Sequence, residues 1–441
     1  SSDVCSSDLA LSERQKLMRL APHLVHPLPF VLPYQKNMRP LWLLRLGLFL
    51  YDHLSSHNQL PHTRLLHRHR DPNYFIGLKA SIDQGFLFHD CSTDDARLTI
   101  LNALQAKEHG ADIQTNCKLI DAKVIQKQWY LTLKNKKNET FHITAKALIN
   151  ATGPWVTPIN QQLNIPLTHT MTLVKGSHMV VPKLYEGDHA YMLQNDDKRI
   201  IFAIPYHHYT LVGTTEVDFN GDLEKIDIDD EEINYLSTCI QHYFNQKILA
   251  KDILNTWSGV RPLLSARGKS SSALSRDYDY HFTQDPAPAV TLYGGKITTF
   301  RQLAAKSVDT LQTIFPHLPC SISDKIPLPG AMIDAMSFEE YRLYAYKKYH
   351  WLHRSILERY LESYGTRTEH FLSACTQYSD LGICFSTFLY GVEVDYLIEE
   401  EWARTSDDIL WRRTKLGLST TDQEKRSLTA YLKAIHQIAI D

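Results

Sequence analysis

The chain has 441 residues, which is enough for two or three domains with sizeable cores. Hydrophobic residues make up 43% and charged residues 22%, and the formal net charge is −2, so the chain lacks the basic excess that collects nucleic acid. The seven cysteines are dispersed and form no C-x-x-C pair. This pattern indicates reduced thiols in a cytoplasmic protein and argues against a disulfide framework or a zinc site.

The N-terminal part is expected to be rich in helices. The first nine residues, SSDVCSSDL, have little apolar content and are interpreted as a non-native leader, with native sequence from Ala10. Residues 11–54 favour helices around a Pro-rich connection. The most apolar run, Leu41–Tyr51, contains Arg45 and is too short to span a bilayer. It predicts a buried helix or, alternatively, a segment on a membrane surface.

The next region predicts the later part of a doubly wound α/β domain. Asp94 and Asp95 are expected to be caps or first-turn acids of a helix that Gly110 ends. The apolar positions of this helix include Leu98, Leu101 and Leu104. Strands are expected at 112–116, in WYLTLKN and in TFHITAKALINATG. A helix followed by strands that end at Ala-Thr-Gly is typical of a nucleotide-binding domain.

The middle of the chain changes to short strands separated by turn residues. The segments KGSHMVVPK, HAYMLQN, KRIIFAIPYHHYTLVGTTEVD and TWSGVRPLL predict a mostly antiparallel sheet that forms a substrate domain. The stretch Val290–Ala304 then returns the chain to the first domain as a strand, a Gly-Gly pair and a helix. The apolar face of that helix is expected to hold Phe300, Leu303, Ala304, Val308 and Leu311. After the linker FPHLPCSISDKIPLPGA the chain is expected to be helical.

Two turns that contain glycine are candidate ligand contacts. Thr152 and Gly153, in INATGPW, follow a strand and let the backbone approach a flat ligand closely. Gly294 and Gly295, in YGGKITTF, precede a helix N-terminus, where backbone amides and the helix dipole stabilise negative charge. Side chains that add donors there are Lys296 and Thr298. Ordinary tight turns are the alternative for both motifs.

Two arginines and a histidine are candidate substrate contacts. Arg261, in SGVRPLL, is expected just after a strand, and Arg276, in LSRDYDY, a short loop later. Two arginines near one sheet edge can form a bidentate clamp for phosphate or carboxylate. His178, in KGSHMVV near Lys175, can take a proton from a substrate hydroxyl at neutral pH. Surface salt bridges and a hydrogen-bonded strand histidine are the alternatives. The motifs HRHRD and YHHY lack ligand spacing, so no metal site is expected.

Taken in order, these segments resemble the FAD-dependent, quinone-linked glycerol-3-phosphate dehydrogenases of bacteria. The matching text includes LGLFLYDHL, DCSTDDARL, NATGPWV, KGSHMVVP, GTTEVDFNGD, SGVRPL, SRDYDY, GGKITTFRQLA and EWARTSDDILWRRTKLGL. The resemblance covers residues 10–441 and implies an α/β fold: an FAD-binding doubly wound domain, N-terminally truncated, with an antiparallel β substrate domain and an α-helical C-terminal domain. The expected parts are a leader at 1–9, the FAD-binding domain at 10–160 and again at 289–318, the substrate domain at 161–288 and the helical domain at 324–441.

The resemblance also implies an activity and its residues. Members of this family oxidise sn-glycerol 3-phosphate to dihydroxyacetone phosphate, passing hydride to FAD and electrons to ubiquinone. By their position in the motifs, the residues expected to be catalytic are His178, Arg261 and Lys296. Those expected to bind substrate are Arg261, Arg276, His178 and Thr298. Those expected to bind FAD are Thr152, Gly153, Gly294, Gly295, Lys296, Ile297 and Thr298.

A peripheral position on the inner face of the cytoplasmic membrane and a homodimer are further expectations from the resemblance. The candidates for lipid contact are the Leu41–Tyr51 run and the basic segment WRRTK near Trp411. A salt-bridged helix face is an equal alternative for Arg412 and Arg413 of that segment.

The sequence departs from the family pattern at its start. Family members begin with a strand, a G-x-G-x-x-G turn and a helix that holds the FAD pyrophosphate, and none of the eighteen glycines here forms that motif. A Ser-rich flavin loop and a further arginine segment are missing as well. The chain as given is therefore expected to bind FAD weakly or not at all. A related flavin oxidase, acting on glycerophosphate with oxygen or on an amino acid, and a non-catalytic remnant that acts as a binding protein remain alternatives.

Overall fold

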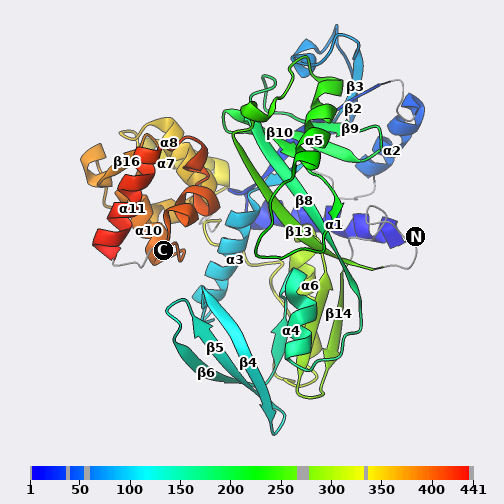
Figure 1. Cartoon of the computed structure of the whole chain (residues 1–441). Coiled ribbons are helices and arrows are strands. Elements are labelled where there is room, and N and C mark those ends of the chain that lie inside the picture. The colour runs from blue at the N-terminus through cyan, green and yellow to red at the C-terminus, as the bar shows by residue number, and fades with distance from the viewer. Residues whose placement is uncertain (1, 36–39, 54–59, 266–277, 332–335, 437–441) are drawn as a thin grey trace. The chain divides into compact units, whose positions relative to one another are not determined.

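The computed structural model describes residues 2–35, 40–53, 60–265, 278–331 and 336–436 (Figure 1). The chain divides into two compact units, and each is assembled from three separate stretches of sequence. Unit 1 holds residues 1–14, 27–90 and 116–323, and unit 2 holds residues 15–26, 91–115 and 324–441. Each unit therefore brings together segments that lie far apart in the chain.

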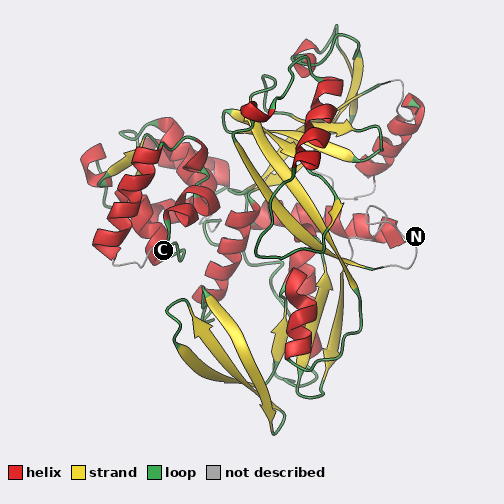
Figure 2. Ribbon diagram, in the orientation of Figure 1, coloured by secondary structure: helices red, strands yellow, loops and turns green. Residues whose placement is uncertain are grey.

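The largest sheet, seen as yellow arrows in Figure 2, has nine strands within the described residues. Their order is β12-β8-β11-β10-β9-β1-β3-β2, and β13 also pairs with β8. The pairs among β8, β9, β10, β11 and β13 are antiparallel, as expected, whereas β1 runs parallel to β9. The strands are β1 (Val25–Pro33), β2 (Arg64–His67), β3 (Gln84–Thr93), β8 (Met171–Pro182), β9 (Ala190–Gln194), β10 (Ile200–Tyr206), β11 (Tyr209–Gly213), β12 (Val217–Asp218) and β13 (Asn255–Leu264).

Helix α5 (Asp230–Tyr243) packs on this sheet and begins with a capping box (Figure 1). The Asp229 carboxylate accepts a hydrogen bond from the Glu232 amide (2.9 Å), and the Glu232 carboxylate accepts one from the Asp229 amide (3.1 Å). The core between helix and sheet includes Met179, Val181, Leu193, Ile201, Val212, Leu236, Ile240 and Tyr243. Burial of this apolar stripe is what holds α5 on the sheet.

A second sheet of unit 1 contains the parallel pair expected for the nucleotide-binding domain. Its order is β14-β15-β7, in which β14 and β15 are antiparallel and β15 and β7 are parallel. A helix follows β7 and another follows β15, as in βα units. The bounds of these elements are β7 (Leu148–Asn150), α4 (Val156–Gln162), β14 (Tyr278–Thr283), β15 (Ala289–Gly294) and α6 (Phe300–Leu311).

The apolar face expected for α6 is only partly correct. Leu303 and Leu311 are buried as expected, but Ala304 and Val308 are exposed. Arg301 of the same helix is also buried. Its guanidinium donates to both oxygens of the buried Glu13 carboxylate, at 2.6 and 2.8 Å. A buried, fully paired guanidinium therefore occupies part of the face that hydrophobic spacing assigns to apolar side chains.

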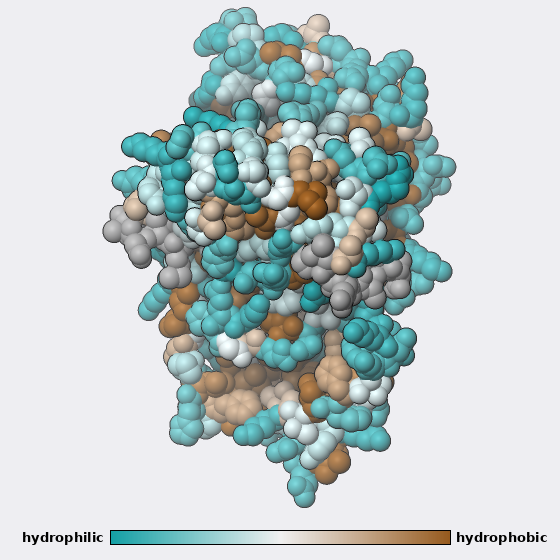
Figure 3. All heavy atoms as spheres, turned by 90° about the vertical axis from the view of Figure 1, so that its left-hand side faces the viewer, coloured by the Kyte–Doolittle hydropathy of each residue, from teal (hydrophilic) through white to brown (hydrophobic). Residues whose placement is uncertain are grey.

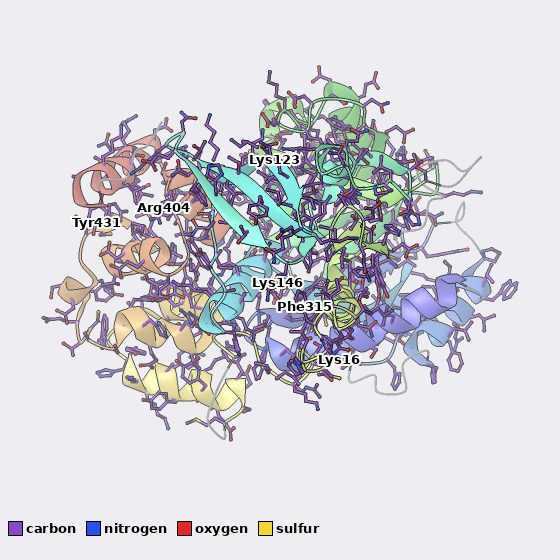
Figure 4. The ribbon with its side chains drawn as sticks, turned by 90° about the horizontal axis from the view of Figure 1, so that it is seen from below. Lys16, Lys123, Lys146, Phe315, Arg404 and Tyr431 are labelled. Atoms are coloured by element: carbon purple, nitrogen blue, oxygen red, sulfur yellow. The ribbon has the colours of Figure 1, made fainter. Side chains whose placement is uncertain are left out.

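The strand expected at 112–116 does not form. Asn116 has a positive φ of 54°, outside the extended region, and the Gln114 amide donates to the Asp112 carboxylate (2.8 Å). The strands expected in WYLTLKN and TFHITAKALINATG do form. The first becomes β5, and the second gives β6 and the strand β7 of the sheet described above. β5 and β6 belong to the antiparallel order β4-β5-β6, where Figure 4 labels Lys123 on β4. The bounds are β4 (Cys117–Ile125), β5 (Gln128–Asn135) and β6 (Thr140–Ala145).

Helix α2 (Leu41–His53) exposes much of its apolar surface, so the prediction of a buried helix is wrong. Trp42 is 68% exposed, Phe49 55% and Leu50 52%. Leu44 and Leu48, on the inner side, pack against a small core of unit 1. A run of apolar residues does not show whether other parts of the protein cover the whole helix or only one side of it. Hydropathy alone therefore cannot distinguish a buried helix from a half-exposed one.

Exposed apolar residues elsewhere are more dispersed. On the face drawn in Figure 3, hydrophobic residues form small patches between hydrophilic ones, which is normal for a protein surface. Residues 2–9, interpreted above as a leader, belong to helix α1 (Ser2–Leu20). Within the described ranges, no helix has both the length and the hydropathy needed to cross a bilayer.

Unit 2 is mainly helical, as expected for its C-terminal part. Its helices are α3 (Asp95–Glu108), α7 (Phe338–Lys348), α8 (Arg354–Tyr364), α9 (Glu369–Leu372), α10 (Gly391–Glu399) and α11 (Asp422–His436). The short strands β16 (Cys384–Ser386) and β17 (Leu389–Tyr390) form a hairpin. Tyr431, labelled in Figure 4, donates its hydroxyl from α11 to Asp395 of α10 (2.9 Å).

Helix α3 confirms the expected cap and apolar positions. The Asp94 carboxylate accepts a hydrogen bond from the Arg97 amide (3.0 Å), and the buried residues of the helix include Leu98, Leu101 and Leu104. The Arg97 guanidinium forms a fully buried ion pair with Glu401. Arg412 pairs with Asp408 (3.2 Å), and Arg413 donates to the Glu401 carbonyl oxygen (2.6 Å). These bonds support the salt-bridged alternative for the segment WRRTK.

Candidate active site

Strands β8 and β13 bring the candidate histidine and one candidate arginine to one face of the large sheet. His178 of β8 lies opposite Trp257 of β13. Arg261 of β13 lies opposite Val174 of β8. Opposed residues of an antiparallel pair share a face, and so do residues two apart on one strand. His178, Gly176 and Arg261 therefore project from the same face.

The Arg261 guanidinium lies over Gly176. A Cβ atom on Gly176 would be 2.7 Å from Nη1 of Arg261 and 2.9 Å from Nη2, so this arrangement requires glycine. Nη2 also donates a hydrogen bond to Thr214 Oγ1 (3.2 Å), in the turn after β11. A planar cation with several donors, held in one place, suits bidentate recognition of a phosphate or carboxylate.

His178 is a neutral imidazole at physiological pH. Burial, and secondly the charge of Arg261, lowers the pKa of His178 to about 4. Its ring stacks on the Trp257 ring with centroids 6.1 Å apart. A Cβ atom on Gly213 of β11 would lie 2.2 Å from His178 Cδ2, so the backbone on that side passes directly against the ring. A half-buried, neutral imidazole beside a cation can accept a proton from an anionic substrate's hydroxyl.

The two glycine turns lie at one edge of the β14-β15-β7 sheet. β7 and β15 are parallel, with Ile149 opposite Val290, so their carboxyl ends coincide. Gly153 has a φ of 57°, Gly294 of 69° and Gly295 of 117°, values that favour glycine. Ligands of open α/β sheets bind outside the carboxyl ends of such strands.

A buried hydrogen-bond network fixes the turn after β7. Asn150 Oδ1 accepts from the Thr152 hydroxyl (2.6 Å), and Asn150 Nδ2 donates to Asn160 Oδ1 (2.8 Å). The same oxygen of Asn160 accepts from the Thr291 hydroxyl of β15 (3.1 Å). Because Asn150 and Asn160 are both buried, these bonds hold the turn in one position beside β15.

Lys296, Ile297 and Thr298 connect the Gly-Gly pair to α6. Lys296 is the residue directly before the single turn η5 (Ile297–Thr299), which runs into α6. Lys296 is half-buried, whereas Ile297 and Thr298 are exposed. Strand β13 contacts both β15 and the turn η2 (Gly153–Trp155). The strand that carries Arg261 therefore adjoins both glycine turns.

Arg276 lies outside the described residues. Three residues that the sequence did not single out take part in the site, namely Thr214, Trp257 and Asn150. Each stands in or beside a quoted motif, GTTEVD, TWSGVRPLL or INATGPW, but the motif does not show which residue it contacts. Among the described residues, no group of three or more His, Cys, Asp and Glu side chains is arranged to hold a metal ion.

Two family models match the chain. Residues 6–286 match the model described as FAD dependent oxidoreductase, and residues 321–438 match the C-terminal domain of alpha-glycerophosphate oxidase. The chain is 42% identical over 434 residues to a glycerol-3-phosphate dehydrogenase of Pseudomonas aeruginosa, an alignment that covers 97% of this chain and 83% of that protein. It is 38% identical over 434 residues to a D-erythritol 1-phosphate dehydrogenase of Brucella abortus, covering 98% of this chain and 86% of that protein.

A solved structure shares the fold. The glycerol-3-phosphate dehydrogenase of Bacillus halodurans, complexed with FAD, aligns with a TM-score of 0.75 at 22% identity, covering 98% of this chain and 86% of that one. The expected α/β fold with a helical C-terminal domain is thereby confirmed.

The two glycine turns fit the flat ring system of an FAD cofactor, and weak binding of the whole cofactor stays a prediction. A Cβ atom on Gly153 would meet nothing within 4 Å, so there is space beside this turn, and two apolar side chains at the turns are exposed, Trp155 by 43% and Ile297 by 48%. FAD is the cofactor of the matched family, as expected from the sequence. By family model, sequence identity and fold, the chain belongs to the FAD-dependent oxidoreductases and, among them, to the glycerol-3-phosphate dehydrogenases.

Proposed function

We propose that this protein oxidises sn-glycerol 3-phosphate at C2 to dihydroxyacetone phosphate, with FAD as the hydride acceptor. The observation that carries the proposal is the pairing of a neutral His178 with a cationic Arg261 on one face of β8 and β13. A phosphate and a hydroxyl that must lose its proton are the groups that such a pair recognises. Glycerol 3-phosphate carries both.

Arg261 is the proposed phosphate contact, and Arg276 is a second one. The hydrogen bond from Arg261 Nη2 to Thr214 Oγ1 (3.2 Å) restricts the guanidinium, so less conformational entropy is lost when an anion binds. Gly176 leaves room for the guanidinium against the strand. By binding the phosphate, the two arginines orient the substrate.

His178 is the proposed base for the C2 hydroxyl. With a pKa near 4 it is unprotonated at neutral pH, so a ring nitrogen is available to take the hydroxyl proton as the carbonyl forms. When bound, the flavin supplies the acceptor for the hydride that leaves C2. The proton and the hydride thus leave the substrate separately, and the product is a ketone.

The proposed flavin contacts are Thr152, Gly153, Gly294, Gly295, Lys296, Ile297 and Thr298. The start of α6 follows them, where the helix dipole favours negative charge. Lys296, the N-cap of η5, adds a cation at the same end and is part of the proposed catalytic set. Thr298 is proposed to contact both flavin and substrate.

Ubiquinone is the proposed electron acceptor, at the inner face of the cytoplasmic membrane. Helix α2 supports this part of the proposal, because it exposes a row of large apolar side chains. Beside them lies a groove of about 320 Å³ lined by Leu32, Leu43, Leu44, Leu46, Gly47, Leu48, Leu50 and Met192. An apolar groove of this kind suits an acyl or isoprenoid chain. A homodimer is also proposed, on the family resemblance alone.

The test is an anaerobic titration. The purified chain is incubated with FAD and desalted, its visible spectrum is recorded, and sn-glycerol 3-phosphate is added. Bleaching of the flavin band supports the proposal; glycerol serves as a control that lacks the phosphate, and D-erythritol 1-phosphate as a competing polyol phosphate. A retained flavin that glycerol 3-phosphate leaves oxidised would refute the proposed substrate. Reoxidation by a quinone analogue without peroxide separates a dehydrogenase from an oxidase.

A further inference from the structure

The face of β8 opposite His178 carries a separate polar network. Lys175 and Ser177 alternate with Gly176 and His178 and therefore project to the other side of the sheet. There they meet Glu232, in the first turn of α5, which is 3% exposed. A carboxylate this deeply buried needs a full set of donors.

Glu232 has that full set. Its Oε1 accepts hydrogen bonds from the hydroxyls of Thr215 (2.5 Å) and Ser177 (2.9 Å). Its Oε2 lies 2.9 Å from Lys175 Nζ and accepts from the Asp229 amide (3.1 Å). A carboxylate has about four acceptor positions, so all are used. This is more than a capping box requires, because only the Asp229 bond belongs to the cap.

Thr215 connects this network to the candidate active site. Its hydroxyl donates to Glu232 Oε1 and accepts from the Ser177 amide (2.9 Å), which fastens the turn after β11 to β8. The preceding residue, Thr214, has its side chain on the other side, where Oγ1 accepts from Arg261 Nη2 (3.2 Å). One turn of two residues thus joins a buried carboxylate to the proposed phosphate contact.

We propose that Glu232 is a positioning residue for the substrate site: through Thr215 it fixes the turn that holds the Arg261 guanidinium in place. This inference rests on the proposed function of Arg261. It assigns Glu232 and Thr215 a role in substrate affinity although neither lies on the face that carries His178 and Arg261.

The test compares two variants of the full chain. Thr215→Val removes the hydroxyl that donates to the Glu232 carboxylate but keeps the shape of the side chain. Asp229→Ala keeps the backbone amide that donates to the Glu232 carboxylate and leaves the turn unchanged, but it removes the acceptor of the Glu232 amide and the ion pair with Lys175 (3.0 Å). The melting temperature of each is measured, and the Kd for sn-glycerol 3-phosphate is determined by titration calorimetry. Thr215→Val is expected to raise Kd on the order of tenfold, because a displaced binding group loses its alignment. Asp229→Ala is expected to lower the melting temperature and leave Kd unchanged.

Thr215→Ser, which restores a hydroxyl, is expected to return Kd to the wild-type value. The proposal is overturned if Thr215→Val binds as well as wild type, or if Asp229→Ala weakens binding as much as Thr215→Val does. A wild-type chain that does not bind glycerol 3-phosphate would refute the proposed function instead. Crystal structures of wild type and Thr215→Val then decide the positioning role: loss of the Thr214–Arg261 bond in the variant supports it, and retention overturns it.

Discussion

Replacing Gly176 with alanine is expected to weaken substrate binding while leaving the fold nearly as stable. The new Cβ would lie 2.7 Å from both Arg261 Nη1 and Thr214 Oγ1. Non-bonded heavy atoms settle at about 3.5 Å, so the guanidinium and the Thr214 hydroxyl must each move by roughly 0.8 Å. The guanidinium is the far end of a flexible side chain, and it can move without disturbing the strand. The 3.2 Å bond to Thr214 does not survive that move.

The magnitude follows from the contact that a displaced guanidinium no longer makes with the substrate. A hydrogen bond between charged groups, such as the proposed one from Arg261 to the phosphate, contributes about 1.5–3 kcal/mol, which corresponds to roughly a tenfold to hundredfold change in affinity. We therefore expect Kd and KM for glycerol 3-phosphate to rise by that factor. The turnover number kcat should change less, because His178 keeps its position against Gly213 and Trp257.

Titration calorimetry gives Kd, and thermal unfolding gives the stability of each variant. The matched control is Gly259→Ala, because Gly259 lies directly opposite Gly176 on β13 and a Cβ there meets nothing within 4 Å. The control should bind like wild type. Wild-type affinity in Gly176→Ala, or equal loss in both variants, would refute the assigned position of the guanidinium.

Three further predictions concern acid sensitivity, the exposed helix and the helical unit. His178 has a pKa of about 4 in the folded protein against 6.5 in an unfolded chain. Between these two pH values the unfolded state binds more protons than the folded state. The free energy of unfolding that His178 contributes therefore falls as pH drops from 6.5 to about 4. An NMR titration that finds the His178 imidazole protonating near pH 6.5 would contradict this. Trp42→Glu should reduce co-sedimentation with anionic lipid vesicles without changing the melting temperature. The control Leu343→Glu, at an exposed site of unit 2, should sediment like wild type. Equal lipid binding by both variants would exclude α2 as the lipid contact. Glu401→Gln should destabilise the fold by about 3–5 kcal/mol, since it leaves the buried Arg97 guanidinium without its counter-charge. Glu358→Gln, in the more exposed pair with Arg354, should leave thermal unfolding unchanged. Similar thermal unfolding curves for the two variants would refute the argument from burial.

Local patterns in the sequence were sufficient to find most strands of the site. Runs of β-branched and aromatic residues predicted β8 and β13, and these strands carry His178 and Arg261. The hydrogen bond of Thr214 to Arg261 could not be predicted, because it depends on how a turn folds back over a strand 47 residues away. Likewise, the burial of Arg301 depends on Glu13, 288 residues earlier in the chain.

Hydropathy was a weaker guide than strand pattern. The run Leu41–Tyr51 has the composition of a core helix, yet only its inner side is covered by the rest of unit 1. Residues 112–116 follow the glycine that ends α3, where a strand was expected, but Asn116 has a left-handed φ and Gln114 bonds to the side chain of Asp112 instead of to a neighbouring strand. Asp and Asn favour such local bonds and are rare in strands, so composition argued against this strand.

Because Arg261 and His178 are close, binding of the substrate's phosphate and protonation of the imidazole affect each other. The positive charge of Arg261 is one reason that the His178 imidazole is a weak base. An anion bound to that guanidinium offsets its field, so occupancy of the phosphate position raises the proton affinity of the imidazole. By thermodynamic reciprocity, protonation of the imidazole strengthens the hold on the anion. The substrate would therefore, by binding at one end, strengthen the base that acts on its other end.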